Sequence, residues 1–282
     1  MDNKKATLVL MPIVIGMIGT LMLSGCGNKV KQVVDEEITT DTASMASKVQ
    51  LDEIMVNIPS PMELTKELSK AGYSYNKGLL NSSGKAGSYS TNLKAASNLG
   101  IYGADLGYTA SYGQTQDVVG YLNVIKQLSD KVGVGKAFDE TTIKKFEANL
   151  GKKDSLEVLI NAAYEKANRN LRSNQRVSTS AVIVAGGWIE GLYLATQIVA
   201  NTPQNEKNED VYLRIWNQMY SFQYVMALLS QYKNNADCAQ MLKDIAEIQQ
   251  LLTEFSGRNR LTNEDVARIN AKVTPLRNQL VN

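Results

Sequence analysis

Apolar residues recur at intervals of three and four positions along almost every stretch of this chain after residue 47. Within residues 115–132, for example, Val118, Leu122 and Ile125 follow this spacing. The spacing places them on one face of an α-helix, whereas a strand needs strict alternation, and no alternating run long enough for a strand is present. The sequence therefore predicts an all-α fold, either a multi-helix bundle or stacked helical hairpins, with about eight or nine helices and no substantial sheet.

Capping residues, glycine and proline divide this pattern into separate helices. Residues 60–63, Ser-Pro-Met-Glu, have the form of a capping box with proline at the first helical position. Asp139, Asp154 and Thr262 are expected to cap three further helices, and Pro275 is expected to kink or split the last one. The last two helices are expected to pair as an antiparallel hairpin. The expected helices cover residues 60–71, 89–112, 115–132, 139–150, 154–171, 181–200, 206–232, 241–255 and 262–280.

Two of these helices are unusually rich in small or apolar residues. The helix over 89–112 contains Gly100, Gly103 and Gly107, and this spacing suggests that another helix approaches it closely. Residues 181–200 form the most apolar internal stretch, which is long enough to span a bilayer. An ionisable residue, Glu190, lies at its centre, where a membrane would make it costly. We therefore expect a buried central helix.

The intervening residues 73–88 are rich in Gly, Ser and Asn, and they are expected to form an ordinary surface loop. Residues 78–85 resemble a phosphate-binding loop, but the spacing of the glycines is wrong and no strand precedes them. Residues 82–85 fit the Ser-x-x-Lys pattern of penicillin-binding enzymes without its partner motif. Neither partial match predicts a site.

The N-terminus has the features of a signal peptide. Lys4 and Lys5 precede an apolar run from Ala6 to Leu23, which ends in small residues. Residues 23–26, Leu-Ser-Gly-Cys, resemble the lipobox of bacterial lipoprotein precursors at all four positions. In that family the cysteine receives a thioether-linked diacylglycerol, the signal is removed in front of it, and the new amino group is acylated with a fatty acid such as palmitate.

This resemblance implies that Cys26 is the lipidation site and the first residue of the mature protein. It divides the chain into a removed signal peptide (1–25), a lipidated flexible tether (26–46) and a single helical domain (47–282). The chain also resembles the uncharacterised all-helical lipoproteins of Bacteroidota. Some surface-exposed members carry acids directly after the cysteine, whereas Gly27-Asn28-Lys29 follow it here. The expected location is therefore the outer membrane, facing the periplasm.

Composition limits the chemistry that the domain can perform. The chain contains no histidine, so it lacks the commonest general base and the commonest zinc ligand. If Cys26 is lipidated, Cys238 is the only remaining thiol and no disulfide can form within the chain. With 30 basic and 28 acidic residues, the chain offers no charge excess for nucleic acid. No metal or cofactor is predicted.

Two sets of residues remain as candidate sites. Asp105 and Glu190 are acids within glycine-rich, apolar helices, and burial would raise their pKa values and suit general acid chemistry. The alternative is that each belongs to a hydrogen-bond network in the core. The second set is aromatic, and it would either line a groove for a sugar or peptide or belong to the core. Its members are Trp188, Tyr193, Tyr212, Trp216, Tyr220 and Tyr224.

These observations favour a lipid-anchored envelope protein with a non-catalytic binding or scaffolding role. Its partners would be the membrane and another envelope protein or a glycan, and not nucleic acid. One alternative is a carboxylate-dependent hydrolase of glycans or cell-wall material that uses Asp105 and Glu190. Two carboxyls ~5–10 Å apart in an open cleft would support it, whereas burial against Tyr or Arg would count against it. A second alternative is a solute-binding module with an aromatic groove.

Overall fold

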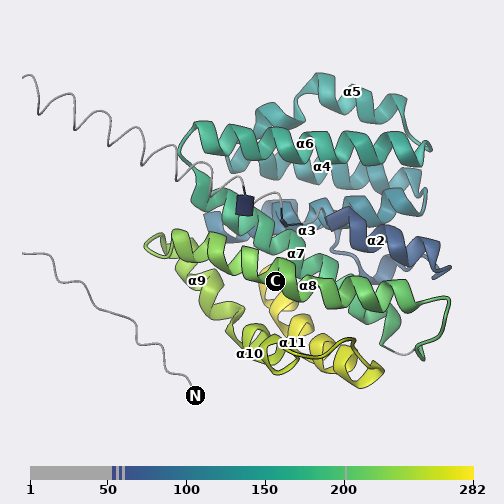
Figure 1. The fold of residues 1–282 in the computed structure, drawn as a ribbon. Coiled ribbons are helices and arrows are strands. Elements are labelled where there is room, and N and C mark those ends of the chain that lie inside the picture. Colours follow the sequence, from purple (N-terminus) through teal and green to yellow (C-terminus); the bar gives the residue numbers. More distant parts are fainter. Residues whose placement is uncertain (1–52, 55–56, 59–60, 201) are drawn as a thin grey trace, which may run out of the picture. The chain divides into compact units, whose positions relative to one another are not determined.

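The two helices with the most small and apolar residues lie at the centre of the fold. In the computed structural model they are α3 (Asn92–Ser111) and α7 (Val177–Val199), and they pack against each other (Figure 1). Every residue of α7 from Thr179 to Thr196 is buried. The structure describes residues 53–54, 57–58, 61–200 and 202–282. The predicted signal peptide, the lipidation site and the tether lie outside these residues.

Glycine allows α3 and α7 to approach each other closely. A methyl group at Gly100 of α3 would lie 2.0 Å from the Ile183 carbonyl oxygen, and one at Gly186 of α7 would lie 2.1 Å from the Ser97 carbonyl oxygen. Both distances are far shorter than van der Waals contact, so each glycine makes room for the backbone of the other helix. The prediction of a close helix approach is confirmed.

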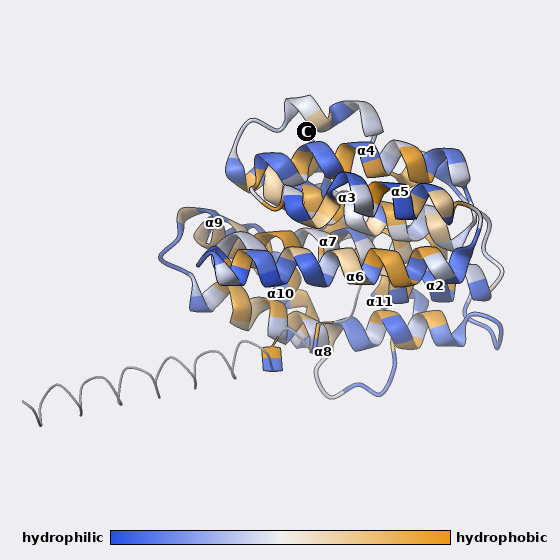
Figure 2. Cartoon of the chain, turned by 90° about the horizontal axis from the view of Figure 1, so that it is seen from above, coloured by the Kyte–Doolittle hydropathy of each residue, from blue (hydrophilic) through white to orange (hydrophobic). Residues whose placement is uncertain are grey.

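The other helices surround this central pair. On one side lie α4 (Thr115–Lys131), α5 (Glu140–Ala148) and α6 (Lys153–Ser173). On the other lie α8 (Glu209–Gln231), α9 (Ala236–Asp244), α10 (Ala246–Glu254) and α11 (Asn263–Val281). A short helix, α2 (Pro61–Lys70), contacts α3, α7 and α8. The outer helices alternate between hydrophilic and hydrophobic residues, as amphipathic helices do (Figure 2).

The all-α prediction is confirmed, because the described residues contain ten α-helices and no strand. The predicted buried central helix is also confirmed. Although α7 is long and apolar enough to cross a membrane, 89% of its most apolar window is buried inside the protein. The last two helices pair in the antiparallel sense, since Glu247 and Glu254 of α10 bind Lys272 and Arg268 of α11, respectively.

Local signals placed most helix ends correctly. Asp139 accepts a hydrogen bond from the Thr142 amide, and Thr262 forms a complete capping box with Asp265. The prediction for Asp154 was wrong, because α6 begins one residue earlier and Asp154 lies in its first turn. Ser60, the first residue of the capping box expected at residues 60–63, lies outside the described residues.

One prediction about helix continuity differs from the structure, and one of the two effects expected of Pro275 does not occur. The expected single helix over 241–255 is divided at Ile245, which ends α9 and begins α10. The apolar spacing continues across this residue, and for that reason the sequence pattern did not reveal the break. By contrast, Pro275 does not split α11, which runs without interruption from Asn263 to Val281.

Candidate functional site

The crossing of α3 and α7 brings the two predicted acids together. Asp105 and Glu190 are both fully buried, with an exposed fraction of 0%. A third charged residue, Arg277 of α11, completes the cluster. Its Nε donates to Glu190 Oε2 at 2.9 Å, and its Nη2 donates to Glu190 Oε1 at 3.0 Å. Such a two-bond pair between arginine and a carboxylate is the strongest ion-pair geometry that side chains offer.

The remaining surroundings of Arg277 also suit a buried cation. Nη2 donates to the Leu79 carbonyl oxygen at 3.2 Å. The guanidinium lies over the ring of Tyr193, 4.7 Å from the ring centroid. The negative face of an aromatic ring attracts a cation in this position. Burial alone would lower the pKa of Arg277, but the neighbouring carboxylates raise it, so the guanidinium stays charged.

Asp105 occupies a different environment within the same cluster. Its Oδ2 accepts a hydrogen bond from the Asn81 amide at 3.1 Å. No described residue donates a hydrogen bond to its Oδ1, which is buried. The Asp105 carboxyl is also close enough to that of Glu190 for the two groups to interact directly. Two carboxylates that face each other have only acceptor atoms, so a proton on one of the two is needed to convert the contact into a hydrogen bond. Asp105 is the better position for it, because Glu190 is already paired with Arg277.

The pKa shifts point in the same direction. Burial, followed by the charge of Glu190, raises the pKa of Asp105 well above its ordinary value. Burial also raises the pKa of Glu190, but the charge and hydrogen bonds of Arg277 oppose that rise. We infer that the cluster holds one proton at neutral pH, which resides on Asp105, while Glu190 is ionised and paired with Arg277.

Asn81 links this cluster to the segment that was expected to be a surface loop. Its side chain donates to the Tyr89 hydroxyl at 2.8 Å and to Asn98 Oδ1 at 3.1 Å. Its carbonyl oxygen accepts from the Tyr121 hydroxyl at 2.9 Å. Asn81 is only 2% exposed, so the surface-loop prediction was wrong at this position. The loop is inserted into the core by polar contacts.

The lysine of the two partial motifs in this loop also has a structural role. Lys85 donates to Asn282 Oδ1 at 2.8 Å and to the Val281 carbonyl oxygen at 3.3 Å. It thereby attaches the loop to the C-terminal end of α11. Cationic side chains at the C-terminus of a helix satisfy its unpaired carbonyls. Nothing around Lys85 indicates a nucleophile or a phosphate.

The aromatic candidates do not meet in one groove. Trp188, Tyr193 and Tyr212 are buried in the core. Trp188 donates to Ser221 Oγ at 3.1 Å, and Tyr212 donates to the Thr202 carbonyl oxygen at 3.1 Å.

The other three candidates lie on α8 and are at least partly exposed. Tyr220 is 52% exposed, and its ring meets that of the half-buried Trp216 with centroids 4.9 Å apart. Tyr224 is half-buried on the same helix, α8.

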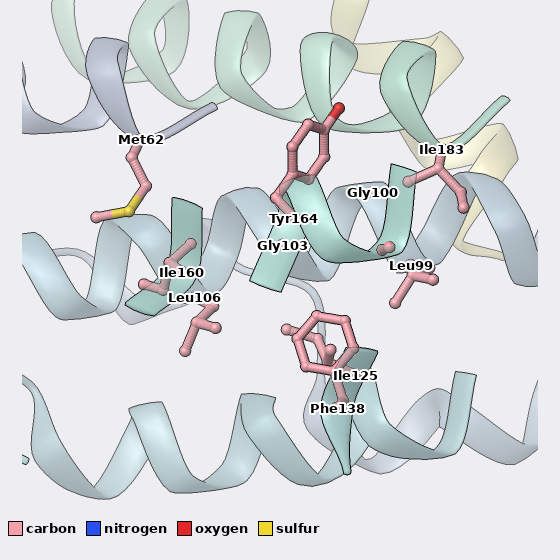
Figure 3. Close-up of a pocket in the computed structure, with 11 residues that line it drawn as sticks. Met62, Leu99, Gly100, Gly103, Leu106, Ile125, Phe138, Ile160, Tyr164 and Ile183 are labelled. Carbon is pink, nitrogen blue, oxygen red and sulfur yellow. The ribbon is translucent and has the colours of Figure 1, made fainter. Parts of the chain in front are cut away.

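A small apolar cavity lies on the other side of α3 (Figure 3). It has a volume of about 40 Å³ and is lined by residues that include Leu106, Ile125 and Ile160. A cavity of ~150 Å³ is needed to hold a ligand as small as benzene. Gly103 borders this space, and a methyl group placed on it would meet no atom within 4 Å. The cavity is therefore a packing gap and not a site for a sugar or peptide.

The remaining thiol is also enclosed. Cys238 is buried, with Sγ 3.5 Å from the Ser178 carbonyl oxygen. Burial raises the pKa of its thiol to about 11, which disfavours the reactive thiolate. Cys238 thus behaves as a small apolar core residue.

Comparison with known proteins adds no further assignment: no family model matches the chain, and neither the curated proteins nor the solved structures give a match. The acid pair meets the condition that counts against a glycosidase, because both carboxyls are enclosed and Glu190 is paired with an arginine.

Sequence reasoning identified Asp105 and Glu190 but missed Arg277 and Asn81. A signal for Arg277 was present, because it lies on the apolar stripe of its helix, four residues after Val273 and three before Leu280. A charged residue on a buried face requires a partner. Asn81 carried no comparable signal within its polar loop.

Proposed function

We propose that this chain is a lipid-anchored cell-envelope protein whose helical domain has a non-catalytic binding or scaffolding role. The lipobox-like residues 23–26 support the anchor. The expected location is the outer membrane, facing the periplasm, with the lipids on Cys26 as the attachment. One acyl chain gives only marginal binding, whereas the two or three chains of a lipoprotein give a stable anchor.

The observation that carries the non-catalytic part of the proposal is the enclosure of the charged cluster. Asp105, Glu190 and Arg277 satisfy one another inside the core and contact no solvent-filled cleft. A general acid has to reach the substrate within hydrogen-bond distance. In this arrangement the three side chains connect α3, α7 and α11 and present no chemistry at the surface.

The anchor can be tested with the two cysteines of the chain, which serve as a matched pair. Cells expressing the full-length protein are fed an alkyne-labelled fatty acid, and incorporation is read after coupling to a fluorophore. Wild type and Cys238→Ala should carry the label, whereas Cys26→Ala should carry none. Labelling of Cys26→Ala at the wild-type level would refute the anchor.

The non-catalytic role makes a separate prediction for a deletion strain. The full-length chain carrying Asp105→Asn should restore any phenotype of the deletion as well as wild type does, because the substitution preserves shape and removes only the titratable proton. Failure to complement at a normal protein level would instead favour a carboxyl that acts in catalysis.

A further inference from the structure

The outward side of α8 differs from the other long surface helices because its last 17 residues, from Ile215 to Gln231, carry no charge, and its charged residues Glu209, Asp210 and Arg214 all lie in the first two turns. From Ile215 to Tyr232 the sequence contains no Asp, Glu, Lys or Arg. The similarly long α6, in contrast, carries an exposed Arg169–Glu165 ion pair, and its Lys166 binds Asp139. α8 lies along one edge of the helical assembly, the lower edge in Figure 2.

Apolar and aromatic side chains occupy this uncharged side. Leu213 is 51% exposed and Tyr220 is 52% exposed. Trp216 lies between them and Tyr224 lies one turn beyond Tyr220, and both are half-buried. The Nε1 of Trp216 is itself buried and has no acceptor among the described residues. Depletion of charge together with enrichment in Tyr and Trp is typical of the core of a protein–protein interface. We call the outward residues of this helix the α8 face: Leu213, Trp216, Asn217, Tyr220, Gln223, Tyr224 and Ala227.

The α8 face complements itself about its midpoint. Tyr220 is equally distant in sequence from the two ends of α8, Glu209 and Gln231. If a second α8 crossed it in the antiparallel direction, with a two-fold axis at Tyr220, each residue would lie opposite its mirror position. Leu213 would then face Ala227, Trp216 would face Tyr224, and Asn217 would face Gln223. Each pair combines residues of similar polarity.

The charges beyond the two ends of the α8 face favour the same antiparallel direction. Residues 206–214 at the start of α8 contain three acids and two basic residues, Lys207 and Arg214, a net charge of −1, whereas Lys233 follows its C-terminal end. An antiparallel pair would place the acidic end of one helix beside the basic end of the other, and a parallel pair would place like ends together. The helix dipoles also favour the antiparallel direction.

We propose that the α8 face is the interface of a symmetric homodimer in which the two α8 helices pack antiparallel around Tyr220. An interface between two copies that uses the same patch on each must not repel itself, and the uncharged face fulfils that condition. A helix of this length extends for ~35 Å, so the contact is at the small end of specific interfaces. The dimer is therefore expected to be weak and concentration-dependent.

Cross-linking at the axis tests the geometry directly. Tyr220→Cys in the full-length chain would place two thiols together, whereas Val158→Cys, on the exposed side of α6, is the matched control at 67% exposure. After treatment of cells with a copper–phenanthroline oxidant, the Tyr220→Cys protein should run at twice the monomer mass on a non-reducing gel. Dimer formation no greater than that of Val158→Cys would overturn the proposal.

A second measurement separates dimerisation from other uses of the face. A chain of residues 27–282 keeps the whole compact unit Val49–Asn282 and lacks the proposed anchor. In analytical ultracentrifugation this chain should dimerise as its concentration rises, Tyr220→Arg should remain monomeric, and Val158→Arg should dimerise like wild type. All three should show the same thermal unfolding.

Two outcomes of this second measurement would overturn the proposal. The first is a wild-type chain that stays monomeric up to the highest soluble concentration. The second is a monomeric chain that floats with phosphatidylethanolamine vesicles and loses this binding on Tyr220→Arg, which would assign the face to the membrane surface.

Discussion

Arg277 of α11 holds Glu190 of α7 through two hydrogen bonds, of 2.9 and 3.0 Å, in the interior of the protein. The two residues are 87 positions apart in sequence, and their pairing joins α7 to α11. Removing one partner of a buried ion pair is more damaging than removing both, because the remaining charge loses its compensation.

The variant Arg277→Met should therefore lose stability by ~3–5 kcal/mol, the usual cost of an unpaired buried charge. Urea unfolding followed by circular dichroism measures this loss. The double variant Glu190→Gln/Arg277→Met should recover a large part of it, since no net charge remains. The single variant Glu190→Gln completes the comparison. If the stability lost by the double variant equalled the sum of the losses of Glu190→Gln and Arg277→Met, the pairing of Glu190 with Arg277 would be refuted.

The close approach of α3 and α7 predicts opposite effects for two glycines on α3. Gly100→Ala places its methyl group against the Ile183 carbonyl and should cost ~1–3 kcal/mol or more, as overpacking does. Gly103→Ala faces the small cavity and should stabilise the protein by up to ~1 kcal/mol through helix propensity. Thermal unfolding of both variants provides the comparison, and equal effects would contradict the described helix crossing.

Asn81 should be far more sensitive than its polar neighbours in the loop. Asn81→Ala leaves the Asn98 side-chain oxygen without this donor inside the core and should cost ~1–3 kcal/mol. Ser83→Ala, in the exposed part of the same loop, should change stability by less than ~0.5 kcal/mol. Hydrogen exchange should also show faster opening of residues 77–91 in Asn81→Ala alone. A neutral Asn81→Ala would show that the loop is not held by this network.

The apolar spacing was sufficient to predict the helices, because each one buries a face and this requirement repeats every turn. It did not reveal the break at Ile245, where the buried stripe continues through two helices, nor the start of α6, which Lys152 precedes without a side-chain cap. Asp105 and Glu190 were recognisable in the sequence as acids in apolar helices. Their contact, however, depends on the crossing of α3 and α7, and local spacing does not encode such a long-range contact.

The contact of the two enclosed carboxyls, together with their burial, favours a proton on Asp105 at neutral pH. The folded protein then binds this proton more tightly than the unfolded chain, in which an aspartate titrates near 3.8. Stability from this group is fully present below that pH and declines as the pH rises towards the folded-state pKa. Asp105→Asn keeps the shape of the protonated acid and removes the titration.

The most direct measurement is the free energy of unfolding in urea from pH 4 to pH 8 for wild type and Asp105→Asn. We expect the stability of wild type to fall relative to Asp105→Asn as the pH rises, with the variant the more stable at pH 8. A constant difference between the two proteins across this range, or a relative gain of wild type at high pH, would contradict a protonated Asp105 and with it the closed, charge-balanced cluster.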